Sequence, residues 1–127
     1  MAETRPIRFG LLEGSLGFHL RLAQLHGFAA FYDDMGRYDV KPGELSVLLM
    51  IEANPGIRQG VLAHTLLIKR AHMTKMVHAM ERAGLVTRRP AEDDGRAVTL
   101  ELSEAGRHAL ADVKPAFARH VSRSSPN

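Results

Sequence analysis

The sequence of 127 residues contains no cysteine and no tryptophan, and only 6% of its residues are aromatic. Without cysteine, the chain can form no disulfide, hold no thiolate-bound metal and use no cysteine as a nucleophile or redox sensor. It also lacks the run of about 18 apolar residues that a membrane-spanning helix requires, and its N-terminus lacks the pattern of a secretion signal. With 45% hydrophobic and 24% charged residues, it is typical of one globular domain, and we expect a cytoplasmic protein with no membrane partner.

Motifs of the common enzyme classes are also absent. The sequence has no glycine-rich phosphate loop, no G-x-S-x-G and no H-E-x-x-H, and its carboxylates are scattered. Seven histidines raise the question of a metal site, but His64, His72 and His78 are spaced by eight and six residues. Those spacings do not place two histidines above one another on a helix face, so we expect no metal, no cofactor and no catalysis.

Positive charge is concentrated in one segment of the chain. The whole chain carries +3, but residues 58–89 carry +6, whereas residues 1–57 carry −2 and residues 90–127 carry −1. Against the single acid Glu81, the middle segment contains Arg58, Lys69, Arg70, Lys75, Arg82, Arg88 and Arg89. Such a segment in a near-neutral chain predicts a surface for an anion, nucleic acid first, although a solvated helix face would give the same pattern.

Apolar spacing predicts five helices. The first spans Leu16 to Tyr32, with Gly36 as the break, and it is apolar on more than one side. A helix of that kind is buried on more than one side, and a partner subunit is a natural way to cover it. The other helices are predicted at residues 42–53, 59–66 (with Val61, Leu62 and Leu66 inward), 69–83, and from residue 104 after the N-cap Ser103, with a frayed end or a loop from residue 122.

A β-hairpin is predicted between the last two helices. The strand-like runs 85–89 and 97–102 surround a polar loop at 90–95. A helix–turn–helix followed by a hairpin is a winged helix, and the hairpin loop is the wing. The expected fold is therefore mainly α with a small β-hairpin: a winged helix–turn–helix at residues 40–102, with an N-terminal segment and dimerisation helix at 1–35 and a C-terminal dimerisation helix at 103–127.

The predicted helix at 69–83 has one apolar and one polar face. On a wheel of 100° per residue, Met76, Val77 and Met80 lie near Met73 and form a core stripe. The opposite surface carries Ala71, Lys75, His78 and Arg82, flanked by Arg70, His72 and Thr74. Little bulk near the start and hydrogen-bond donors beyond it suit a helix that enters the major groove of DNA, and its free N–H groups attract phosphate. An ordinary exposed amphipathic helix is the alternative.

Three stretches within residues 42–110 carry a resemblance to a known family. They are PGELSVLLMIEANPGIRQGVLAHTL, IKRAHMTKMVHAMERAGLVTRRP and DDGRAVTLELSEAG, and the last contains Asp-x-Arg followed by Leu-(Thr/Ser)-x-x-Gly. In these stretches the chain resembles the MarR family (multiple antibiotic resistance regulators), which are homodimeric winged-helix transcription factors. The resemblance implies a homodimer that binds double-stranded DNA at an inverted-repeat operator.

The resemblance also implies roles for individual residues. Arg96 matches the family's wing-tip arginine, which would enter the minor groove. Asp94 would pair with a nearby arginine and brace the wing. The family's contacts to bases and backbone fall on Arg70, Ala71, His72, Thr74 and Lys75.

The chain departs from the family pattern at three points. Lys69 stands where many relatives have a capping or acidic residue. Ala71 and His72 stand where many have small hydroxyl residues, which predicts a different operator. Family members usually carry a further C-terminal helix, so a chain ending at Asn127 is either trimmed, which we expect, or forms an unusual dimer.

A small-molecule effector is a further implication of the resemblance. Such a ligand, anionic or phenolic, would bind between the dimer lobe and the DNA-binding lobe, where Arg21 could meet a carboxylate. Residues 16–25 (LGFHLRLAQL) are similar to first helices of members that answer to hydroxycinnamoyl-CoA thioesters, so an aromatic acid or its CoA thioester is expected. The candidate lining residues, for whose aromatic members core packing is the alternative, are Phe18, His19, Arg21, Phe28, Phe31 and Tyr32.

Taken together, the residues and the resemblance predict a sequence-specific DNA-binding transcriptional regulator, a repressor released by its ligand. Two other functions fit the same residues. One is an architectural DNA-binding protein without a ligand, and the other is a winged-helix module that binds protein.

Overall fold

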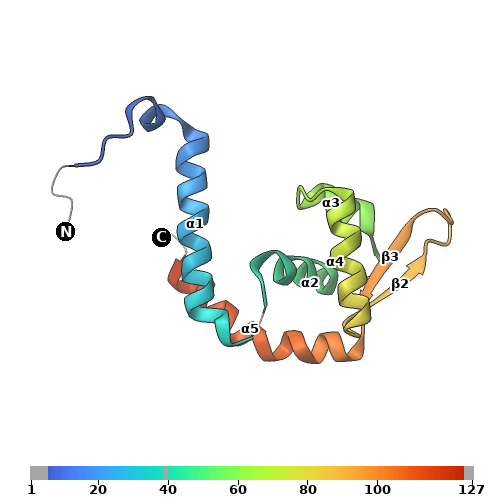
Figure 1. The fold of residues 1–127 in the computed structure, drawn as a ribbon. Helices are drawn as coiled ribbons and strands as arrows, with labels where there is room; N and C mark the ends of the chain where they lie inside the picture. The colour runs from blue at the N-terminus through green and yellow to red at the C-terminus, as the bar shows by residue number, and fades with distance from the viewer. Residues whose placement is uncertain (1–5, 39, 125–127) are drawn as a thin grey trace.

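The computed structural model describes residues 6–38 and 40–124, and its helices and hairpin follow the predicted order (Figure 1). In Figure 1, α2, α3, α4 and the sheet form a compact head, and α1 pairs with the C-terminal part of α5 beside it. The elements are η1 (Gly10–Gly14), α1 (Leu16–Met35), η2 (Gly36–Tyr38), α2 (Pro42–Ala53), β1 (Ile57–Arg58), α3 (Gln59–Thr65), α4 (Arg70–Arg82), β2 (Val86–Pro90), β3 (Val98–Leu102) and α5 (Glu104–Ser124).

Helix α1 is packed mainly at its C-terminal end. It begins after Ser15, whose Oγ accepts a hydrogen bond from the Phe18 N–H at 3.1 Å. Of its 20 residues, Phe31 and Met35 are buried. Large apolar side chains along the rest of the helix stay exposed, namely Leu16, Leu20, Leu25, Phe28 and Tyr32. The apolar surface that was expected to face a partner is therefore uncovered in the single chain.

Helix α5 joins α1 to the head. Its His120 Nδ1 lies 2.8 Å from Asp34 Oδ2 of α1, and the His120 ring meets the Phe31 ring edge-on at 5.6 Å. Pro115 removes one hydrogen bond from within α5, and the ribbon changes direction between its two halves (Figure 1). The expectation of a frayed end or loop from residue 122 is wrong as far as Ser124, where α5 ends, and its remainder lies outside the described residues.

The predicted hairpin is confirmed, and a third strand joins it. Strands β2 and β3 pair antiparallel, with Val86 opposite Leu102 and Pro90 opposite Val98. The two-residue strand β1 pairs with the other side of β3, so the order is β1-β3-β2. This third strand connects the start of α3 directly to the root of the wing.

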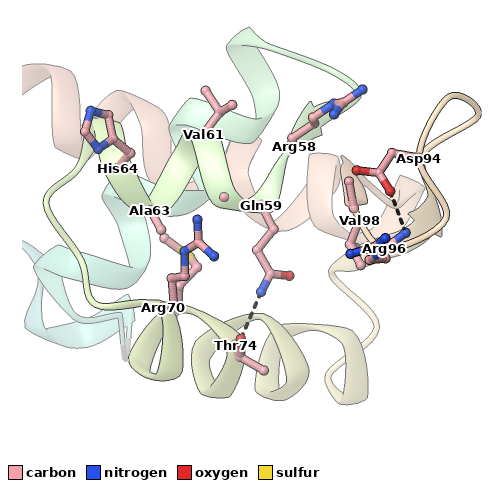
Figure 2. Close-up of a pocket in the computed structure, with 13 residues that line it drawn as sticks. Arg58, Gln59, Val61, Ala63, His64, Arg70, Thr74, Asp94, Arg96 and Val98 are labelled. Carbon is pink, nitrogen blue, oxygen red and sulfur yellow. Dashed lines mark hydrogen bonds between the residues drawn. The ribbon is translucent and has the colours of Figure 1, made fainter.

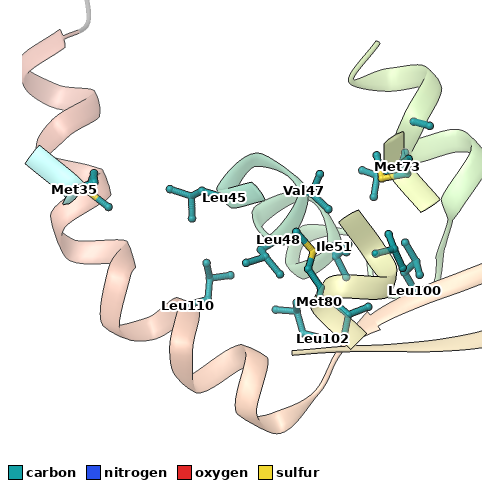
Figure 3. Close-up of a cluster of buried hydrophobic side chains, with 14 of the residues drawn as sticks. Met35, Leu45, Val47, Leu48, Ile51, Met73, Met80, Leu100, Leu102 and Leu110 are labelled. Carbon is teal, nitrogen blue, oxygen red and sulfur yellow. The ribbon is translucent and has the colours of Figure 1, made fainter. Parts of the chain in front are cut away.

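The hydrophobic core of the head lies between α2, α4 and the sheet (Figure 3). Leu45 and Ile51 of α2, Met73 of α4 and Leu100 of β3 are almost completely buried, and Leu110 brings α5 against the same cluster. Burial of such side chains contributes about 1.5–3 kcal/mol each to folding. The core thus fixes α4 on the sheet and leaves its opposite face free.

One inward prediction in α3 is wrong. Leu62 is buried and Leu66 is partly buried, as expected, but Val61 is 52% exposed. Helix α3 is only seven residues long, and Ala63 takes the second buried position in place of Val61.

Candidate nucleic-acid interface

Helix α4 has the two faces that its sequence predicts. Its side chains at Met73, Val77 and Met80 are buried, and Met76 packs partly against the same core. The outward surface includes the exposed residues Arg70, Ala71, His72, Lys75 and Arg82, together with Thr74 and His78, which are half-buried. The exposed surface is therefore cationic, and small at Ala71, as a helix entering the major groove requires.

The start of α4 lacks a side-chain cap. Lys69 occupies the N-cap position with extended backbone, and its side chain makes no capping hydrogen bond. Leu67, two residues earlier, has a φ of 56°, a left-handed conformation that is costly for a residue with a Cβ. The uncapped N–H groups and the partial positive charge of the helix end therefore face solvent beside a lysine, an arrangement that suits a phosphate.

The wing is closed by a turn in which Asp94 has a specific role. The Ala91 N–H donates to the Ala97 carbonyl at 2.9 Å, and the Arg96 N–H donates to Asp94 Oδ1 at 3.0 Å. Arg96 is left exposed at this turn. Contrary to expectation, Asp94 forms no ion pair with an arginine side chain among the described residues, and the neighbouring Asp93 instead pairs with Arg58 of β1. The side chain of Asp94 instead fixes the backbone that carries Arg96.

A cavity of about 620 Å³ separates α3, the start of α4 and the wing (Figure 2). Arg58, Arg70 and Arg96 reach it from β1, α4 and the wing respectively, and Asp94 is the one acid among its lining residues. Three guanidinium groups against one carboxylate give this cavity a positive lining, which suits the phosphate backbone of nucleic acid.

The cavity divides the predicted DNA-binding residues into two groups. It brings together Arg70, Thr74 and Arg96 from elements far apart in the sequence. Lys75 lies on the exposed face of α4 outside the cavity, as do Ala71 and His72. Thr74 is also held in place, because Gln59 Nε2 donates a hydrogen bond to its Oγ1 at 3.1 Å (Figure 2).

Sequence reasoning missed Arg58, Gln59 and Asp93. Arg58 belongs to the basic segment, but its place in a strand beside the wing depends on the pairing of β1 with β3. No local sequence pattern predicts that pairing. No feature of the local sequence marks Gln59 as a residue of the site. Asp93 stands next to Asp94, and only the geometry of the turn decides which of the two carboxylates faces Arg58.

The candidate ligand-lining residues of α1 do not form one site within the chain. Phe18 and His19 lie near the N-terminal end with Arg21, and the Phe18 ring packs against Phe9 at 5.4 Å. Phe31 is buried against Tyr32 and His120. Phe18 and Phe28, which are ten residues apart, are separated by about 15 Å along the helix, because each residue rises about 1.5 Å. None of the six lines the cavity of about 620 Å³ or a smaller one of about 130 Å³ beside α2.

Other kinds of site were also sought in the described part of the chain. In residues 6–38 and 40–124, no group of three or more metal-binding side chains comes together. Within the same residues, no helix has the length and apolar character needed to cross a membrane.

The MarR family model matches residues 40–98, which include α2, α3, α4, β2 and the wing. Over 119 residues the chain is 34% identical to a protein of Thauera aromatica assigned as the transcriptional regulatory protein for the hcr operon, and the match covers 93% of this chain and 72% of that protein.

Solved structures of a repressor share the fold. The structure of the transcriptional repressor CouR bound to a 23-mer DNA duplex has 37% sequence identity and a TM-score of 0.82, covering 94% of this chain and 84% of that one. CouR bound to p-coumaroyl-CoA has 35% identity and a TM-score of 0.79, covering 93% of this chain and 83% of that one.

Proposed function

The chain belongs to the MarR family, whose members are DNA-binding transcriptional regulators and not enzymes, and from that premise we propose that it is a repressor released from its operator by an aromatic acyl-CoA. The observation that carries the proposal is the cavity at which the cationic start of α4 and the wing meet. A duplex that receives α4 in its major groove presents the adjoining minor groove to Arg96. We assign DNA contacts to Arg70, Ala71, His72, Thr74, Lys75 and Arg96.

The repressor acts as a homodimer, as MarR proteins do. In this proposal the exposed apolar side chains of α1 and the C-terminal part of α5 form the dimer lobe, because burial of Leu16 and Leu20 against a second copy removes their apolar surface from water. A two-fold dimer places two copies of α4 in successive major grooves. The operator is then an inverted repeat with half-sites about 10 base pairs apart, and the protein meets it in the cytoplasm.

The ligand class is supported by the similarity to CouR, which was solved with p-coumaroyl-CoA. The spread of the candidate residues also favours a long ligand. A free phenolic acid is shorter than the separation of about 15 Å between Phe18 and Phe28, whereas an acyl-CoA can contact both groups. Arg21, which is exposed, is suited to a phosphate of the CoA moiety.

Fluorescence anisotropy with a labelled fragment of the protein's own promoter tests the proposal. We expect tight binding over random DNA of equal length, with affinity that falls steeply as salt rises, because bound phosphates release counterions. p-Coumaroyl-CoA should release the DNA at concentrations at which p-coumarate and CoA alone do not. Equal affinity for promoter and random DNA would favour an architectural DNA-binding protein instead, and release by p-coumarate alone would contradict the acyl-CoA assignment.

A further inference from the structure

Two consecutive residues at the start of α3 reach both of the DNA-contacting elements. Figure 2 shows the side chains of Arg58 and Gln59 diverging, with Gln59 directed toward Thr74 on α4 and Arg58 toward the wing. The backbone of this dipeptide is fixed, because Arg58 pairs with Thr99 of β3 and Gln59 begins a helix.

Arg58 holds the tip of the wing. Its Nη2 donates to Asp93 Oδ1, across 35 residues of sequence, with the side chains 41% and 73% exposed. The strand pairing of β3 already fixes the root of the wing, but residues 91–97 extend beyond it. The ion pair is thus a side-chain tie between the loop that carries Arg96 and the rest of the head.

Gln59 holds a side chain on the recognition helix. Its Nε2 donates to Thr74 Oγ1, so the Thr74 hydroxyl acts as acceptor there and keeps its own proton to donate. The other amide atom, Gln59 Oε1, is buried and has no hydrogen-bond partner among the described residues. The contact with Thr74 is therefore the hydrogen bond observed for this side-chain amide in the described part of the chain.

We propose that Arg58 and Gln59 are positioning residues that set the distance and angle between α4 and the wing, so that major-groove and minor-groove contacts fall in register on one operator. This inference rests on the proposed DNA binding. The competing explanation is that Arg58 only adds positive charge to the interface, as any exposed arginine beside DNA would.

Substitution of the acidic partner separates the two explanations. Asp93→Asn removes a negative charge near DNA, so by charge alone it should strengthen binding. If Asp93 positions the wing through Arg58, the same change should weaken operator binding by about two- to fivefold, the effect of one exposed ion pair. Glu92→Gln is the matched control, because it removes the same charge from the adjacent, exposed position, for which no ion pair is observed in the described structure. It should leave affinity unchanged or raise it.

A charge swap between Arg58 and Asp93 gives a double-mutant cycle that decides between the two explanations. Arg58→Asp and Asp93→Arg should each weaken operator binding, and the double variant, with the original net charge, should recover most of the lost affinity. In a protein that already carries Arg96→Ala and so lacks the wing contact, Arg58→Ala should reduce operator affinity little further. In a protein that carries Lys75→Ala, Arg58→Ala should cause its full loss of operator affinity. Additive effects throughout, or a stronger complex with Asp93→Asn, would overturn the positioning role.

Gln59 is tested in the same way through Thr74. Gln59→Ala should weaken binding in the wild-type background and have little further effect in Thr74→Val, which cannot accept its hydrogen bond. An equal cost in both backgrounds would show that Gln59 does not act through Thr74.

A measurement without DNA separates this inference from the proposed function. Hydrogen exchange of the Ala91 and Ala97 amides, which are bonded within the wing, should accelerate in Arg58→Ala and Asp93→Asn but not in Glu92→Gln. A wild-type protein with no preference for its operator would refute the proposed function, whatever the rates of hydrogen exchange in the wing. A wild-type protein that binds its operator, with wing exchange unchanged in both variants, would refute the positioning role alone.

Discussion

Gly106 lies against the backbone of Leu85, so closely that a Cβ on Gly106 would be 2.1 Å from the Leu85 carbonyl oxygen. That oxygen also accepts a hydrogen bond from the Ser103 N–H at 2.9 Å, and Ser103 Oγ accepts one from the Gly106 N–H at 2.9 Å. The first turn of α5 is thereby fixed to the segment that follows the recognition helix. This contact is one route by which a movement of the α1–α5 pair would reach α4, because α5 also packs against α2 and β3.

Gly106→Ala should destabilise the fold. The clash is with a backbone oxygen that is already hydrogen-bonded, so neither partner can rotate away, and we expect a loss of about 1–3 kcal/mol or more in the free energy of unfolding. Gly43→Ala is the control, because a Cβ there meets nothing within 4 Å and alanine favours the helix. Urea denaturation of both variants measures the difference. Equal stabilities would show that α5 can move away from Leu85 at no cost.

A charge on the exposed apolar side of α1 should separate the homodimer. Leu20 is 60% exposed in the single chain, and Leu20→Glu would bury a carboxylate in the proposed interface, which costs several kcal/mol when it has no partner. Leu67→Glu makes the same chemical change at an 89% exposed position in the head and should leave the dimer intact. Sedimentation at micromolar concentration should give a monomer for the first variant only. A dimer in both would move the interface away from Leu20.

Local signals allowed most of the fold to be predicted from the sequence. Gly84, which follows the C-cap residue Ala83 of α4, has a φ of 79°, and Ser103 caps α5, as their residue types indicate. The periodicity of Met73, Val77 and Met80 identified the buried face of α4. Each of these features depends on interactions within a few residues of sequence.

What could not be predicted depends on contacts between distant residues. Strand β1 has two residues and exists because β3, about 40 residues later, offers a free edge. The choice of Asp93 over Asp94 as the partner of Arg58 follows from that placement and from the turn geometry. The cavity likewise requires α4 and the wing to be positioned on the sheet before Arg70 and Arg96 can face the same space.

Lys69 should lower the stability of the fold and strengthen DNA binding. It occupies the N-cap of α4 without making a capping hydrogen bond, so Lys69→Ser should stabilise the fold by about 1 kcal/mol. The same variant should bind the operator more weakly, with a salt slope lower by about one if Lys69 meets a phosphate. Lys69→Ala removes the same charge without adding a cap, and should share the loss of binding but not the gain in stability. Thermal unfolding and anisotropy measure the two effects, and unchanged binding in both variants would place Lys69 outside the interface.

Arg96 and Lys75 should affect affinity and specificity differently. Arg96 is exposed on the wing, where a minor-groove contact senses groove width more than base identity. Arg96→Ala should therefore weaken binding to every operator variant, most where the flank is A·T-rich, and lower the salt slope by about one.

Lys75 lies outside the cavity on the exposed face of α4, whereas Arg70 lines the cavity. We therefore expect Lys75 to read a base and Arg70 to hold a phosphate. Lys75→Ala should cost about 1–3 kcal/mol and relax the preference at one position per half-site, while Arg70→Ala should weaken binding to all sequences alike. Anisotropy across a set of single-base operator variants tests both, and a relaxed preference with Arg70→Ala in place of Lys75→Ala would reverse the assignment.

Asp94 should act through its hydrogen bond and not through its charge. Its Oδ1 accepts from the Arg96 N–H at 3.0 Å, and this contact fixes the turn that presents the Arg96 side chain. Asp94→Asn keeps a side-chain oxygen that can accept the same bond and removes a negative charge beside DNA, so operator binding should be unchanged or tighter. Asp94→Ala removes the charge and the acceptor together, and should weaken binding because the turn is no longer fixed. The comparison should be made at several salt concentrations, since a pure charge effect fades as salt rises and a conformational effect does not. If both variants bind more tightly, Asp94 is only a repelling surface charge and the wing geometry does not depend on it.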